Sequence, residues 1–204
     1  MSLAFHHGHG SPYSWRVWLA LEHLGVPYEL KVISFSDKDQ LKPEFVAINP
    51  RHQVPTIVDD GYALWESMAI NLYLARKHGK GLWPATVEGE GLAFQWSFFA
   101  VTEIDPTINE WARHRIVLPE AERDPKVAAA ALEKLQRPLA VVDAALAHRP
   151  YLAGGAFTVA DLNLAAALFR ARRMDHAARP NLARWLADCF SRPAARRAWA
   201  MRGE

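Results

Sequence analysis

The sequence predicts an N-terminal half of mixed α/β structure followed by an all-helical half. Strand-like and helix-like segments alternate over residues 1–83, whereas from residue 87 onward the pattern is helical and contains no convincing strand. The change coincides with a short run rich in glycine and proline near residues 79–87. We therefore place one domain at residues 1–83 and the other at residues 84–204.

The first half has the predicted order β-α-β-α-β-β-α. Apolar periodicity, a stop at Gly25 and the hairpin sequence Asp59-Asp60-Gly61 define the segments. In order, we expect a strand over 3–7, a helix over 14–24, a strand over 28–33, a short helix over 42–48, strands over 56–58 and 62–64, and a helix over 67–77.

The second half reads as five helices separated by proline-containing loops. Pro106 must kink or split the first of them, because it has no N–H to donate. The predicted helices cover residues 91–115, 125–148, 158–173, 181–190 and 194–201.

Composition excludes several classes of protein. The chain has 204 residues and a mass of 22.9 kDa, and no apolar run reaches the roughly 18 residues of a membrane span. Cys189 is the only cysteine, so an internal disulfide and a multi-cysteine zinc site are excluded. The first residues lack the pattern of a secretory signal, and we expect a cytoplasmic location without membrane association.

Charge and histidine content point to neither nucleic acid nor a metal. The net charge is +2, and the arginines of residues 149–204 alternate with alanine and tryptophan at helical spacing, as on solvated helix faces. His6 and His7 are neighbours on a strand and point to opposite faces, so these side chains do not converge on an ion. We expect no metal and no nucleic-acid partner.

The first candidate site motif is S-P-Y-S-W-R-V, between the first strand and the first helix. A helix N-terminus stabilises an anion, and the Ser11 hydroxyl can donate a hydrogen bond to it. Alternatively, Ser11 and Ser14 are ordinary loop and cap residues.

The second motif is Gln53-Val54-Pro55-Thr56, where a proline enters a strand. A cis Val54–Pro55 bond in a tight turn would leave the Val54 backbone free to pair with an extended peptide. An ordinary trans proline at a strand start is the alternative.

The third motif is Trp65-Glu66-Ser67, at a strand-to-helix junction. The Ser67 hydroxyl and N–H suit a carboxylate, and Glu66 suits an ammonium, so the pair matches an α-amino acid head group. A plain helix cap is the alternative.

These motifs, in this order, resemble the glutathione transferase family of the cytosolic, serine-type and bacterial-like kind over nearly the whole chain. The resemblance implies a thioredoxin-like first domain, an all-α second domain and glutathione as co-substrate. It maps the catalytic serine to Ser11, with Ser14 expected as the helix cap. It also implies that F-T-V-A-D-L is a helix-capping signature. The implied glutathione contacts are Gln53, the Val54 backbone, Glu66 and Ser67, with Lys42 a weaker candidate for the glycine carboxylate, and the implied structural residues are Pro55, Thr158 and Asp161.

The resemblance also implies an activity, which is conjugation of glutathione to a hydrophobic electrophile by a homodimer, as in detoxification. The expected electrophile pocket includes His9, Tyr13, Trp96, Phe99 and Glu103. Two alternatives remain. The W-R-V continuation resembles the zeta class, which includes maleylacetoacetate isomerases, although Pro12 and Tyr13 replace the S-S-C pattern of that class. A non-catalytic glutathione-binding protein of the same fold is the other.

Overall fold

The computed structural model describes residues 2–201, without the side chain of Arg173. The chain divides into two compact units, one formed by Met1–Trp83 and Arg192–Glu204 and the other by Pro84–Ser191. In this division the C-terminal helix groups with the first unit, whereas the sequence-based prediction places it in the second domain. The indole Nε1 of Trp15 donates to the Ala198 carbonyl at 3.0 Å, which fixes that helix to the first unit.

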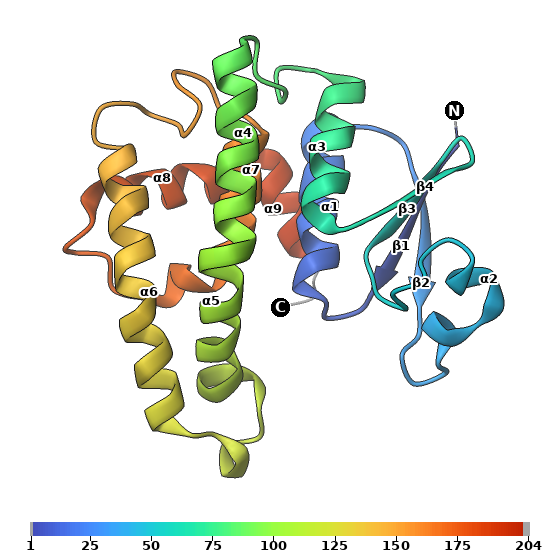
Figure 1. The fold of residues 1–204 in the computed structure, drawn as a ribbon, viewed down its shortest axis with the longest axis horizontal. Coiled ribbons are helices and arrows are strands. Elements are labelled where there is room, and N and C mark those ends of the chain that lie inside the picture. The colour runs from blue at the N-terminus through green and yellow to red at the C-terminus, as the bar shows by residue number, and fades with distance from the viewer. Residues whose placement is uncertain (1, 202–204) are drawn as a thin grey trace. The chain divides into compact units, whose positions relative to one another are not determined.

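The first unit is a mixed four-stranded sheet with helices (Figure 1), and its predicted β-α-β-α-β-β-α order is confirmed. The strand order is β2-β1-β3-β4, with β1 parallel to β2 and antiparallel to β3, and β3 antiparallel to β4. Its elements are β1 (Leu3–Gly8), α1 (Pro12–Leu24), β2 (Glu29–Ile33), the 3₁₀ turn η1 (Asp39–Leu41), α2 (Pro43–Val46), β3 (Thr56–Asp59), β4 (Tyr62–Trp65), α3 (Ser67–His78) and α9 (Pro193–Ala200).

Helices α1 and α3 pack against each other on one face of the sheet, and α2 lies on the other side (Figure 1). Helix α1 is almost wholly apolar on its buried side, where Trp15, Val17 and Leu21 are at most 1% exposed. It ends at Gly25, whose φ of 58° is left-handed and whose N–H bonds to the Leu21 carbonyl at 2.9 Å. Burial of this apolar side fixes the position of α1, so the N-terminus of the helix lies next to the end of β1.

The second unit consists of helices alone, apart from one isolated bridge between Tyr151 and Gly154 within its described residues. Its elements are α4 (Val87–Phe99), η2 (Ala100–Ile104), α5 (Asp105–Ala112), η3 (Arg113–Val117), η4 (Glu120–Glu122), α6 (Pro125–Ala145), α7 (Val159–Ala167), η5 (Phe169–Arg173) and α8 (Pro180–Ser191). No described helix is both long enough and apolar enough to cross a membrane.

Pro106 splits the first long helix through a π-helical turn. The turn η2 ends at Ile104, and Pro106 follows in the first turn of α5, where its missing N–H is tolerated.

Helix α7 is shorter than the sequence predicts, since it ends at Ala167 and tightens into the 3₁₀ turn η5. Leu168, with φ −87° and ψ 10°, marks that change.

Asp161 is fully buried and connects three segments of the second unit. Its Oδ2 accepts from the Thr158 N–H at 3.0 Å, and the Thr158 hydroxyl accepts from the Ala160 N–H, which forms a capping box. Its Oδ1 accepts from the Leu152 N–H at 2.8 Å and from Trp185 Nε1 at 2.9 Å. Asp161 thus serves the packing of the helices.

Acidification should destabilise the first unit through His23. Burial, followed by the charges of Arg192 and Arg197, lowers the pKa of His23 to about 4. Since the unfolded side chain has a pKa near 6.5, stability is full above that value and is lost as pH falls toward the folded value. Between about pH 7 and about pH 5 we expect a loss of about 2 kcal/mol in the free energy of unfolding.

Urea unfolding of His23→Gln at both pH values tests this prediction, with the exposed His148→Gln as the matched control. The loss of stability between the two pH values should be smaller in the His23 variant than in the wild type by about 2 kcal/mol. Equal slopes in His23→Gln and the wild type would contradict the prediction.

Candidate functional site

The strand register brings the three sequence motifs to one end of the sheet. His6 pairs with Thr56, and Thr56 pairs with Trp65. The segment after β1, the loop before β3 and the junction after β4 therefore lie at the same end of three adjacent strands. Ser11, the Gln53–Val54 loop and Glu66–Ser67 belong to these three segments.

Ser11 is the N-cap of α1, which corrects the expectation that Ser14 caps this helix. The Ser11 Oγ accepts from the Ser14 N–H at 3.2 Å, and its backbone is extended, with φ −69° and ψ 120°. Ser14 lies one turn inside, is fully buried, and accepts from the Gly8 N–H at 3.3 Å. Because the Ser11 oxygen is the acceptor in its cap bond, its hydroxyl proton can be donated to a ligand.

Two histidines share a small cavity with Ser11. The cavity has a volume of about 10 Å³ and is lined by His7, His9, Gly10, Ser11, Trp15, Trp18 and Met201. His7 is buried against Trp18, with ring centroids 4.5 Å apart, whereas His9 is exposed. The structure therefore places His9, but not His7, at the surface near Ser11.

Buried Asn49 organises the loop that precedes β3. Its Nδ2 donates to the Gln53 carbonyl at 2.7 Å and to the Thr56 hydroxyl at 2.9 Å, and its Oδ1 accepts from the Arg51 N–H at 3.0 Å. The Val54–Pro55 peptide is cis, as the family resemblance implies. Sequence reasoning missed Asn49, although an asparagine before Pro50 signals a side chain that bonds to the backbone of a turn.

Close packing holds this loop against the end of β1. A Cβ atom at Gly8 would lie 2.7 Å from side-chain atoms of both Phe35 and Val54, so any larger residue would have to displace them. Val54 also packs in a small buried cluster with Ile33 and Phe45.

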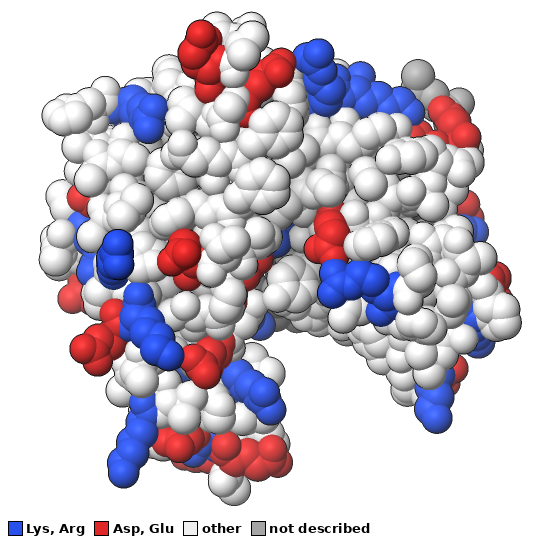
Figure 2. Space-filling view, in the orientation of Figure 1, with Lys and Arg blue, Asp and Glu red and all other residues white. Residues whose placement is uncertain are grey.

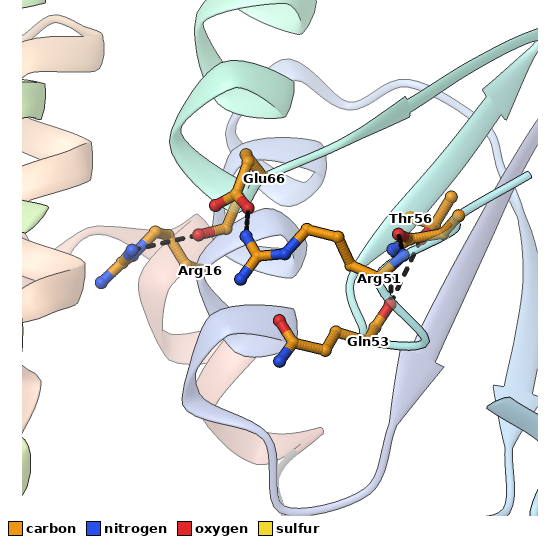
Figure 3. Close-up of polar contacts among 7 residues, drawn as sticks. Arg16, Arg51, Gln53, Thr56 and Glu66 are labelled. Carbon is orange, nitrogen blue, oxygen red and sulfur yellow. Dashed lines mark hydrogen bonds and ion pairs between the residues drawn. The ribbon is translucent and has the colours of Figure 1, made fainter.

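Glu66 and Ser67 lie at the junction between β4 and α3, the third of the three motif segments. Glu66 precedes α3 with a φ of 73°, a conformation that non-glycine residues rarely adopt. Its exposed carboxylate forms an ion pair with the Arg51 guanidinium (Figure 3). Ser67 is buried at the first position of α3, and its hydroxyl accepts from Arg16 Nη1 at 3.0 Å. A backbone held in such a conformation next to a helix start is typical of binding sites.

Two arginines therefore belong to the site in addition to the predicted residues. Arg16 is buried on α1, and Arg51 lies two positions before Gln53. A signal for Arg16 was present in the sequence, since it is a charged residue within the apolar run Trp15–Trp18. Arg51 carries no comparable signal, because an arginine in a loop is ordinary.

Lys42 lines a different cavity from the one next to Ser11. Its ammonium bonds the Asp39 carboxylate at 2.6 Å, which raises the pKa of Lys42 and lowers that of Asp39. Both side chains line a cavity of about 510 Å³ on the α2 side of the sheet, together with His6 and Phe45. Burial, more than the nearby Lys31, lowers the pKa of His6. The Lys42 ammonium has three N–H donors and is half exposed, so it can donate to a glycine carboxylate while it keeps its bond to Asp39.

The residues expected around the electrophile are divided between the two units. In the first unit, Tyr13 is 39% exposed, and the Arg16 guanidinium carbon lies over its ring, 5.4 Å from the ring centroid. In the second unit, Trp96 is buried on α4 and packs edge-on against Phe99, while Glu103 is exposed in η2. No group of three or more His, Cys, Asp or Glu side chains within residues 2–201 is arranged to hold a metal ion.

Two family models match most of the chain. The model described as the N-terminal domain of glutathione S-transferase matches residues 10–77, and the one described as its C-terminal domain matches residues 104–193. The chain belongs to the glutathione S-transferase family. Its first unit is accordingly the thioredoxin-like domain of that family, and the helical domain follows it.

Solved structures of the family are similar over nearly the whole chain. The theta-class glutathione S-transferase of Xanthomonas axonopodis pv. citri, solved with glutathione bound, is 30% identical with a TM-score of 0.89, covering 97% of this chain and 96% of its own. The glutathione transferase URE2P6 of Phanerochaete chrysosporium, in complex with oxidized glutathione, is 27% identical with a TM-score of 0.85, covering 99% and 96%. A glutathione transferase of Burkholderia graminis, with two glutathione molecules per subunit, is 29% identical with a TM-score of 0.84, covering 97% and 87%.

Proposed function

We propose that the protein binds glutathione and adds its thiolate to a hydrophobic electrophile. One observation carries this proposal. The Ser11 hydroxyl, the cis-proline loop and the Glu66–Ser67 helix start all lie at the same end of the sheet. The glutathione bound in the related structures supports it. In this arrangement the Val54 backbone pairs with the cysteinyl residue, Glu66 and Ser67 hold the γ-glutamyl group, and Gln53 adds a polar contact.

The chemistry needs only one strong donor at the sulfur. A free thiol has a pKa of about 8.5, and lowering it by about two units requires roughly 2.7 kcal/mol of preference for the anion. One hydrogen bond to a charged group supplies about 1.5–3 kcal/mol, and a helix N-terminus adds about 0.3–1 kcal/mol. Ser11, which caps α1, offers both. The thiolate then attacks the electrophile, and the site acts by positioning and electrostatics.

Glutathione addition to a panel of aryl halides, epoxides and enones tests this function. We expect turnover with at least one of these electrophiles. Turnover of a maleyl-type substrate alone, by cis-trans isomerisation, would favour the zeta-like isomerase. Glutathione binding in calorimetry without any turnover would favour a non-catalytic binding protein.

Replacing Ser67 with alanine should weaken glutathione binding at least about tenfold. The variant loses a hydrogen bond to the ligand carboxylate, and bonds to charged groups contribute about 1.5–3 kcal/mol. Calorimetric titration measures this loss. The exposed Ser191→Ala is the control, and thermal unfolding shows whether removing the partner of Arg16 disturbs the fold. Unchanged affinity would exclude Ser67 from the site.

We further propose that the protein is a homodimer in which the first unit of one chain packs against the helical unit of the other. The face over α4 carries few charged side chains (Figure 2), and on that helix Phe94 and Phe98 are 43% and 64% exposed. Light scattering should give twice the 22.9 kDa mass of one chain. Phe98→Glu should shift the mass toward the monomer, whereas Val117→Glu, at a similarly exposed position of the same unit, should not. A wild-type monomer at micromolar concentration would contradict this proposal.

A further inference from the structure

An ion pair borders the proposed γ-glutamyl site. Arg51 Nη1 contacts Glu66 Oε1, and the two side chains are 49% and 53% exposed. The Arg51 guanidinium also lies over the Trp65 ring, 5.9 Å from its centroid. A planar cation is thus oriented next to the carboxylate that is expected to receive the glutathione ammonium, and solvent reaches both groups.

The backbone presents Arg51 and Gln53 together. The Asn49 side chain binds the Arg51 N–H at 3.0 Å and the Gln53 carbonyl at 2.7 Å, and His52 between them has a left-handed φ of 56°. In Figure 3 the side chains of Arg51 and Gln53 extend in the same direction from the loop, away from Thr56. Arg51 therefore extends from the same Asn49-bonded loop as Gln53, which is proposed to contact glutathione.

We propose that Arg51 recognises the α-carboxylate of the γ-glutamyl group. The inference rests on the proposed function, since it adds a specificity-determining residue to the same glutathione site. A zwitterionic head placed on the Arg51–Glu66 pair puts its carboxylate on the guanidinium and its ammonium on the glutamate, so that opposite charges alternate. An arginine fork matches a carboxylate with two parallel bonds, which lysine cannot do.

The existing ion pair does not oppose this arrangement. Exposed ion pairs contribute little to stability, because water screens them and two long side chains must be held in place. Small rotations of Arg51 and Glu66 can therefore admit the ligand at little cost. On the other side, the Ser67 oxygen accepts from Arg16, so the Ser67 hydroxyl proton can be donated to the ligand carboxylate. The site consequently selects thiols that carry a free γ-linked amino acid head over those that carry only an acyl group.

Calorimetry with three peptides tests the inference. The peptides are glutathione, 4-aminobutyryl-cysteinylglycine, which lacks the α-carboxylate, and glutaryl-cysteinylglycine, which lacks the α-amine. Arg51→Gln should bind glutathione about tenfold more weakly than the wild type and bind the carboxylate-free peptide unchanged. Arg51→Lys should fall between the two proteins for glutathione. The matched control is Arg76→Gln, which removes an exposed arginine from a tryptophan ring elsewhere in the same unit and should bind all three peptides as the wild type does.

The outcomes separate the inference from the proposed function. Equal weakening of glutathione and of the carboxylate-free peptide in Arg51→Gln would overturn the role of Arg51 while the glutathione site survives. Tighter glutathione binding in that variant would show that Arg51 merely competes for Glu66, and would also overturn it. If the wild type binds none of the peptides, both the inference and the proposed function are wrong. Thermal unfolding of each variant confirms that these exposed positions leave the fold intact.

Discussion

Replacing Ser11 with alanine is expected to raise the pKa of bound glutathione by about one to two units, equivalent to roughly 1.4–2.7 kcal/mol. The Ser11 oxygen accepts the Ser14 N–H, so the hydroxyl proton is the donor that the thiolate would lose. At neutral pH the conjugation rate should fall about tenfold or more, with a smaller change in glutathione affinity. Ultraviolet absorbance of the thiolate in the binary complex, titrated against pH, measures the pKa.

Three further variants identify the donor. Ser11→Thr retains a hydroxyl and a cap, so it should restore much of the low pKa. Tyr13→Phe and Ser14→Ala should leave the titration unchanged, because Tyr13 lies under Arg16 and Ser14 is buried. If only Tyr13→Phe moves the titration, the catalytic residue is Tyr13 and the family assignment stands. Loss of the cap lowers stability by about 1 kcal/mol, which thermal unfolding reports separately.

Asp161→Ala is expected to be the most destabilising single change in the second unit. The carboxylate accepts hydrogen bonds from Leu152, Thr158 and Trp185, and burial of Asp161 and Trp185 keeps water from replacing it. Each buried donor left without an acceptor costs about 1–3 kcal/mol, so the loss of three acceptor bonds should lower the free energy of unfolding by at least about 3 kcal/mol. Urea unfolding followed by tryptophan fluorescence measures it.

A graded series distinguishes this network from a general effect of removing an acid. Asp161→Asn keeps one carbonyl oxygen and should lose less stability than the alanine variant. The exposed Asp175→Ala, in the same unit, loses only a local bond to the Ala177 N–H and should cost less than about 1 kcal/mol. A loss in Asp161→Ala no larger than that of Asp175→Ala would show that the network contributes little.

The sequence by itself determined the order of elements in the first unit and the positions of its three junctions. These follow from local chemistry: apolar periodicity, the stop at Gly25, the hairpin at Asp59–Gly61 and the proline after Val54. The capping box of Thr158 and Asp161 is equally local, because its partners are three residues apart. Spacing alone can specify such features.

Only the tertiary structure decided which residues meet. The pairing of Arg51 with Glu66 and of Arg16 with Ser67 spans 15 and 51 residues, and it depends on the register that aligns Thr56 with Trp65. The role of Ser11 as the cap, with Ser14 turned inward to Gly8, depends on where β1 ends relative to α1. Helix α9 joins the first unit because Trp15 and Glu22 contact it across about 175 residues or more of sequence. Long-range contacts of this kind arise from packing and register, which no local pattern encodes.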